Sequence, residues 1–226
     1  MKKFLIVLAL MFASLPVFAI DTSEKTVREI GFKILNANTL DKRVVFKAVP
    51  VVKDTGLYRG WHSWELKHPE STYLAHSDRT ITIFENTLRL ADNQDELAAI
   101  LSQGIAQAQE SYKGLFRGFF APPAGVFTSK KYEDKADLKA VDYMVNAGYN
   151  PVALIAVYNK DLGQTRYEWC HPRSLASKRM MNVYGYVYDK YPQYLKNNQY
   201  AENVYYVNFL LTSKDDMKKF EKKRGL

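Results

Sequence analysis

The sequence predicts an α+β fold, in which a small, mostly antiparallel sheet packs against a helical core. Two observations predict this class. β-Branched and alternating segments cluster before residue 90, and segments with helical apolar spacing surround them. The 226 residues, 47% of them hydrophobic, are enough for one compact domain with a core. The sequence has no internal repeat and no composition typical of a linker.

The N-terminal segment has the three parts of a secretory signal peptide. Two lysines precede an apolar run over 4–13, and a small-residue cleavage site ends at Ala19. The apolar run is too short for a membrane span. We therefore expect a signal peptide over 1–19, a single domain over 20–226, and a periplasmic or secreted protein. A retained N-terminal anchor helix is the alternative.

The first part of the mature chain predicts one helix and several strands. Residues 22–38 have helical apolar spacing between a Thr-Ser start and an Asn-rich stop. Residues 43–52 are β-branched and predict a strand, and the aromatic segment 56–68 suggests a further one. Alternation over 80–84 predicts a hairpin whose turn lies at Ser77-Asp78.

A long helix follows this hairpin. Asp92 or Asn93 is expected to cap it, and Asp95 and Glu96 lie in its first turn, where the helix dipole favours acidic side chains. One face of this helix is apolar and comprises Leu97, Ile100, Leu101, Ile105 and Ala108.

Three more helices are predicted, over 131–148, 151–163 and 174–191. Gly148 is a C-terminal stop for the first of them, and Asn150 caps the next. Before them comes a loop with three glycines and two prolines, which carries an unusual number of aromatic residues. Its phenylalanines either cover a cleft or form an exposed patch for a polypeptide or membrane; they are Phe116, Phe119, Phe120 and Phe127.

The C-terminal region from about residue 192 is rich in tyrosine and basic. The whole chain has a net charge of +8, and the final segment, SKDDMKKFEKKRGL, holds six Lys or Arg against three acids. A solvated terminal helix explains this composition, so we expect no nucleic-acid partner, while peripheral contact with an anionic membrane stays open. Cys170 is the only cysteine, which leaves a buried thiol or a pairing with another chain.

Several segments, taken in order, resemble one enzyme family. They are RTITIFENTLRLADNQDELAAIL, EDKAD followed by AVDYMVNAGYNPVAL, and HPRSLASKR. Over roughly residues 24–190 the chain is similar to the zinc metallopeptidases that include the CAAX prenyl protease, HtpX and BepA. The resemblance implies a zincin-like fold and a metal helix with the motif H-E-x-x-H. It also implies a third metal ligand from E-x-x-x-D, and a later His-Pro and Arg.

The chain departs from this pattern at the residues that perform the chemistry. Gln103 and Gln107 stand where the resemblance places the two histidines, and Gly104 stands at the general base. Glu133 matches the third ligand and Asp137 completes its motif. Amide oxygens are poor zinc ligands compared with imidazole, and glycine has no side chain to accept a proton. We therefore expect no catalytic residue, no bound metal and no other cofactor.

The residues that surround this degenerate motif allow several interpretations. We expect Gln103 and Gln107 to hydrogen-bond to each other or to Glu133. Arg179, which matches the family's later arginine, or Lys178 could neutralise the remaining carboxylate. Alternatively, Glu133 is a first-turn helix acid and Asp137 pairs with a cation on the surface.

Two features are harder to interpret from the sequence. His171 matches the His-Pro of the family, or is a loop histidine without a role in a site. Gly104 costs a helix interior about 1 kcal/mol relative to alanine. It reflects either drift after the loss of catalysis or a close approach to the backbone.

The function that this pattern favours is that of an inactive peptidase relative in the cell envelope. Such a protein would bind polypeptide as a chaperone-like or adaptor module in protein quality control. One alternative is an active zinc metalloendopeptidase with unusual ligands such as Glu133, His171 and His76. The other alternative is a structural envelope protein that assembles through its Tyr-rich C-terminal region.

Overall fold

The computed structural model of the protein describes residues 24–40, 44–49, 73–75, 80–84, 88–111, 130–162 and 176–225. The expected signal peptide, the segment 56–68, the hairpin turn and the aromatic loop lie outside these residues. Cys170 and the four histidines, including His171, lie outside them as well.

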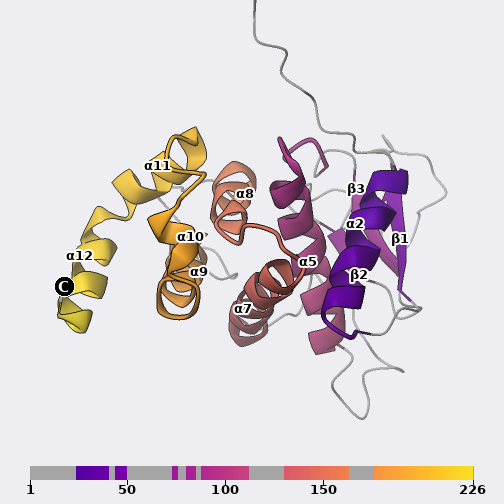
Figure 1. Cartoon of the computed structure of the whole chain (residues 1–226), viewed down its shortest axis with the longest axis horizontal. Helices are drawn as coiled ribbons and strands as arrows, with labels where there is room; N and C mark the ends of the chain where they lie inside the picture. The colour runs from indigo at the N-terminus through magenta and orange to yellow at the C-terminus, as the bar shows by residue number, and fades with distance from the viewer. Residues whose placement is uncertain are drawn as a thin grey trace, which may run out of the picture.

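The described part of the chain is predominantly helical with one small sheet (Figure 1). In chain order the elements of its first half are α2 (Glu24–Ala37), β1 (Val45–Val49), β2 (Tyr73–Ala75), β3 (Thr80–Phe84) and α5 (Gln94–Ser111). Those of the second half are α7 (Lys130–Asn146), α8 (Ala153–Leu162), α9 (Ala176–Lys190), α10 (Gln193–Lys196), α11 (Val204–Thr212) and α12 (Lys214–Arg224).

The sheet has the strand order β1-β3-β2. β2 and β3 pair in antiparallel fashion with Leu74 opposite Thr82, which confirms the predicted hairpin. β1 is parallel to β3, with Phe46 opposite Ile81, so the expectation of a mostly antiparallel sheet is wrong. A parallel pair needs a long connection, and the chain supplies one because β1 and β3 are far apart in sequence, with β2 between them.

Helix α2 packs against the sheet through a close contact between Gly31 and the Phe46 ring. A Cβ at position 31 would lie 2.6 Å from this ring, closer than any real contact, so a larger residue here would require the Phe46 ring to shift. Phe32 adds an edge-on aromatic contact to Phe46, with ring centroids 6.0 Å apart. This end of the molecule buries apolar side chains from both elements, namely Val27, Ile34, Leu35, Ile81 and Ile83.

Helix α5 lies in the middle of the molecule and contacts α2, α7 and α8 (Figure 1). Asn93 caps it, because its Oδ1 accepts a hydrogen bond of 3.0 Å from the Glu96 N–H, which is one of the two predicted capping choices. All five residues of the predicted apolar face are buried. Because this apolar face packs in the core, α5 fixes the positions of the neighbouring helices and of the polar side chains that they carry.

The turn between α7 and α8 follows the sequence signals closely. The Tyr149 N–H donates to the Met144 carbonyl (2.9 Å) and the Gly148 N–H to the Val145 carbonyl (3.0 Å). This is a Schellman motif, with Gly148 at a φ of +78°. The Asn150 side chain then caps the next helix through the Val152 N–H at 3.0 Å, as predicted.

Helices α9 to α12 form the end of the molecule opposite the sheet (Figure 1). The sequence predicted α9, and it predicted a solvated terminal helix that matches α12, in which no residue is buried. It did not predict α10 or α11. Within the described residues, no helix combines the length and the apolar composition that a membrane crossing requires.

Gly148→Ala is expected to destabilise the protein by about 1 kcal/mol, because an alanine side chain is strained at positive φ. No neighbouring atom lies within 4 Å of the added Cβ, so the loss would come from the backbone alone. Urea denaturation measures the change in the free energy of unfolding. Gly148→Asn is the matched variant and should lose less, since asparagine tolerates this conformation. Equal losses in the two variants would contradict the assignment.

Candidate functional site

Two packed helices carry the residues that match the metallopeptidase motif. α5 holds Gln103, Gly104 and Gln107, and α7 holds Glu133 and Asp137. The two helices lie in extensive contact with each other. Gln103, Gly104, Glu133 and Asp137 are buried and Gln107 is half-buried. The fold therefore brings these separated parts of the sequence to one interior region.

Asp137 is the centre of this region and is only 1% exposed. Both of its carboxylate oxygens accept hydrogen bonds from Arg179 on α9, from Nε at 2.7 Å and from Nη2 at 2.7 Å. The Tyr158 hydroxyl from α8 donates to Oδ1 at 2.5 Å. Gln103 donates a longer bond of 3.4 Å from Nε2 to the same oxygen. The Asp137 cluster, formed by these four residues, thus joins α5, α7, α8 and α9.

Arg179 is held as a permanent cation inside the protein. Its Nη2 also donates to the Tyr158 hydroxyl oxygen at 3.0 Å, and its guanidinium carbon lies 4.4 Å from the centroid of the Tyr158 ring. Burial by itself would lower the pKa of Arg179. Attraction to the oxygen of Tyr158 and the carboxylates of Asp137 and Glu133, with the hydrogen bonds to Asp137, instead raises it well above its usual value.

The sequence indicated three of the four residues of the Asp137 cluster, but it indicated neither Tyr158 nor the way in which the residues pair. Arg179 supplies the cation, which is one of the predicted interpretations, but it donates two of its hydrogen bonds to Asp137, and Lys178 lies 3.9 Å from Asp134. Glu133 is buried in the first turn of α7, where its charge acts on Arg179. The alternative that Asp137 pairs on the surface is wrong because it is buried.

The structure gives Gln103 a hydrogen-bond partner that the sequence did not predict. Its Nε2 donates to the Asp137 Oδ1, and the bonds predicted among Gln103, Gln107 and Glu133 stay predictions. The physical reason is the Arg179 fork, which fixes the Asp137 carboxylate in the interior and leaves Oδ1 within reach of Gln103. A buried, charged carboxylate is a stronger hydrogen-bond acceptor than the side-chain amide of Gln107, which is half-buried one turn further along α5.

The donor atoms at the motif positions do not fit a zinc ion. They consist of the amides of Gln103 and Gln107 and the carboxylate of Glu133, whereas structural and catalytic zinc sites use at least three strong nitrogen, sulfur or carboxylate ligands. A guanidinium close enough to Glu133 to feel its charge also disfavours a second cation there. In the described part of the chain, no three His, Cys, Asp or Glu side chains are grouped so that they could hold a metal.

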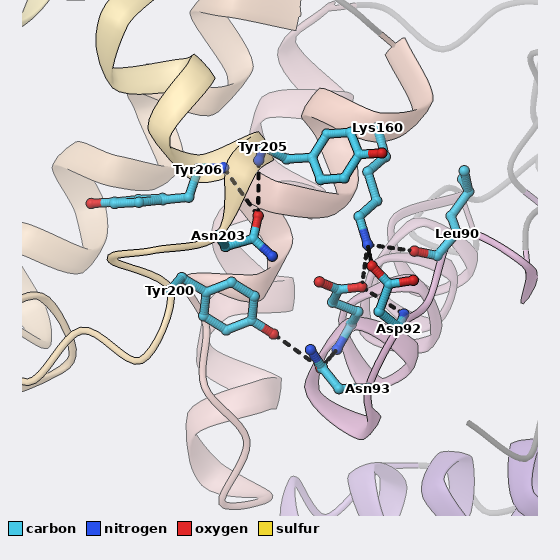
Figure 2. A network of polar contacts seen from close by, with 9 residues as sticks. Leu90, Asp92, Asn93, Lys160, Tyr200, Asn203, Tyr205 and Tyr206 are labelled. Carbon is cyan, nitrogen blue, oxygen red and sulfur yellow. Dashed lines mark hydrogen bonds and ion pairs between the residues drawn. The ribbon is translucent and has the colours of Figure 1, made fainter. Parts of the chain in front are cut away.

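A second buried ion pair lies at the N-terminal end of α5 (Figure 2). The Lys160 ammonium on α8 contacts the Glu96 carboxylate at 2.6 Å and the Asp92 carboxylate at 2.5 Å, and it donates to the Leu90 carbonyl at 2.9 Å. Glu96 is fully buried and also accepts a 2.7 Å hydrogen bond from the Asp92 N–H. This network ties the start of α5 to the end of α8.

The sequence pattern indicates Glu96 only as a first-turn acid and assigns no role to Lys160. The available signal was position, since Glu96 lies one turn before Ile100 and thus on the buried face of the helix. Lys160 likewise follows the segment VALIAVY, which is buried throughout. A charged side chain beside such a buried segment requires an opposite charge nearby, because burying an unpaired charge costs much free energy.

The C-terminal region is attached to the same network (Figure 2). The Tyr200 hydroxyl donates to the Asn93 Oδ1 at 3.0 Å, and Lys160 lies 5.0 Å from the Tyr205 ring centroid. Burial, followed by the charge of Glu96, raises the pKa of Tyr200 far above its usual value. The side chains of Tyr200 and Tyr206 are therefore buried in the core of this chain and do not form a surface for contacts with other chains.

Comparison of this chain with models of known protein families, with curated proteins and with solved structures finds no match.

Asp137→Asn is expected to lower the free energy of unfolding by about 3 kcal/mol, because it leaves Arg179 charged and buried without its counter-ion. Chemical denaturation of the purified variant measures the loss. Asp216→Asn is the matched control, since it removes an exposed pair with Lys219 and should change stability by less than about 0.5 kcal/mol. Similar effects of the two substitutions would refute a structural role for the buried pair.

Proposed function

We propose that this chain is a catalytically inactive relative of the zinc metallopeptidases that it resembles. In this proposal it is exported to the cell envelope and binds polypeptide there as a chaperone-like or adaptor module. The observation that carries the proposal is the Asp137 cluster. Residues at the family's motif positions come together in it, but they form a closed set of hydrogen bonds around Arg179.

The arrangement of the helices supports the family assignment. In a zincin-like fold, the metal helix has to pack against the helix that provides the third ligand. α5 and α7 pack in this way, and Gln103 on one contacts Asp137 on the other. Glu133 lies one helical turn before Asp137, so the two carboxylates of the E-x-x-x-D motif share a face of α7.

The chemistry at the motif supports a loss of catalysis. Gly104 offers no group that could deprotonate a water molecule, and the neutral amides of Gln103 and Gln107 would not retain zinc. The Asp137 carboxylate already accepts hydrogen bonds from Arg179, Tyr158 and Gln103. The side chains of the Asp137 cluster therefore satisfy one another, which is the state expected of a structural core.

Polypeptide binding is the property of a peptidase that survives such a loss. Interactions that bind substrate equally well in the ground and transition states do not depend on the reacting groups. Removing the metal ligands abolishes the chemical step and leaves those interactions in place. The predicted signal peptide supports an envelope location, where unfolded polypeptides are the expected partners.

The purified protein should slow the aggregation of an unfolded model substrate without cleaving it. Light scattering measures aggregation, and mass spectrometry of the same samples detects fragments. The expected result is protection that EDTA does not alter, with the substrate intact. Fragments that disappear on adding EDTA would overturn the proposal in favour of an active metallopeptidase, and a lack of protection would overturn the polypeptide-binding role.

Restoring the motif separates the family assignment from the binding role. Gln103→His, Gly104→Glu and Gln107→His together should create a site that takes up one zinc ion, detected by calorimetric titration. The matched control adds Glu133→Gln to these three changes and should bind zinc at least tenfold more weakly, because it removes the third ligand. A restored variant that folds normally but binds no zinc would contradict the family assignment.

A further inference from the structure

Helix α11 exposes large apolar side chains at the end of the molecule away from the sheet. Val204 is 71% exposed and Leu211 is 70% exposed. They are seven residues apart, which is two helical turns, so they lie on the same face. The opposite face buries Tyr206 and Phe209, and α11 is therefore seated firmly on α8. Tyr205, which is 38% exposed, extends the outward apolar surface by one side chain.

Helix α12 follows immediately and is strongly basic. It carries six Lys or Arg against Asp215, Asp216 and Glu221, and none of its residues is buried. Two of its cations are paired, Lys219 with Asp216 and Arg224 with Asp189. Four exposed lysines have no acidic partner among the described residues, and these are Lys214, Lys218, Lys222 and Lys223.

The position of α12 relative to the rest of the molecule is fixed by packing. The Phe220 ring lies edge-on to Tyr188 and Tyr184 of α9, with centroids 5.4 and 5.8 Å away. It also sits over Gly185, where an added Cβ would lie 3.0 Å from it. Packing against α9 therefore anchors α12, which follows α11 directly and lies with it at the outer end of the molecule (Figure 1).

We propose that α11 and α12 form a docking surface for an anionic lipid bilayer. Exposed aliphatic side chains next to a tyrosine suit the interface between head groups and acyl chains. Clustered lysines gain free energy near anionic head groups. The surface thus offers the two complementary features that a bilayer of this kind recognises. This inference does not depend on the proposed polypeptide-binding function.

Other occupants fit this surface less well. A second copy of the chain, docked through the same face, would bring two net-positive α12 helices together, and their charges would repel. A nucleic acid would attract the lysines but would leave Val204 and Leu211 exposed to water. An acidic bilayer is the partner that accounts for both the apolar and the basic residues.

Co-sedimentation with lipid vesicles tests the proposal. The purified protein should bind vesicles of equimolar phosphatidylglycerol and phosphatidylcholine, bind pure phosphatidylcholine much less, and dissociate as salt is raised. Lys218→Glu with Lys222→Glu should weaken the binding about tenfold or more. Val204→Asn with Leu211→Asn should weaken it roughly tenfold through lost apolar burial.

Matched variants elsewhere on the surface provide the controls. Lys25→Glu with Lys135→Glu makes the same charge change on α2 and α7, and Val45→Asn changes an exposed valine on β1. These variants should keep at least half of the vesicle binding, and circular dichroism should report unchanged folding for every variant. A failure to bind the anionic vesicles would overturn the proposal, as would equal losses in test and control variants.

Two further outcomes would assign the surface to a different partner and overturn the proposal. One is a dimer in analytical ultracentrifugation that Val204→Asn with Leu211→Asn dissociates. The other is tight, salt-sensitive binding of single-stranded DNA that the lysine variant loses and the Val204 and Leu211 variant retains.

Discussion

The ion pair between Asp137 and Arg179 joins the helices on which the interior of the protein depends. It connects α7 to α9 directly, and through Tyr158 and Gln103 it reaches α8 and α5. Buried ion pairs add little net stability compared with apolar side chains of similar volume, because desolvation offsets their attraction. Their stronger effect is on geometry. The two parallel hydrogen bonds from Arg179 and the bond from the Tyr158 hydroxyl require specific positions of the helices that carry these residues.

The second buried pair, between Lys160 and Glu96, acts on the same helices at the opposite side of α8. Tyr158 and Lys160 are two residues apart on that helix, so they point in different directions, one to the Asp137 cluster and the other to the start of α5. α5 is thus held at its N-terminal end by Lys160 and near its middle by Asp137. Among the described residues, the long Gln103 bond is the hydrogen bond that a motif side chain of α5 contributes to this arrangement.

Local signals in the sequence predicted the elements well, because capping and turn chemistry depend on neighbouring residues. Asn93, Gly148 and Asn150 perform the roles that their positions indicated, and the hairpin pairs as expected. Pairings between distant residues were not predictable in the same way. Tertiary packing decides both the parallel pairing of β1 with β3 and the partner of Gln103. No short segment of the sequence contains both members of such a pair, so local patterns do not predict them. Glu96 and Lys160, 64 residues apart, illustrate the same limit.

In the Asp137 cluster, the guanidinium of Arg179 compensates the buried carboxylate in the region where the peptidases that the chain resembles would bind a metal cation. Native mass spectrometry of the protein, purified without chelators and then mixed with one equivalent of zinc, tests this claim most directly. We expect the folded protein to keep the mass of its polypeptide alone. A folded species heavier by one zinc ion, lost on substitution of Glu133, would contradict it.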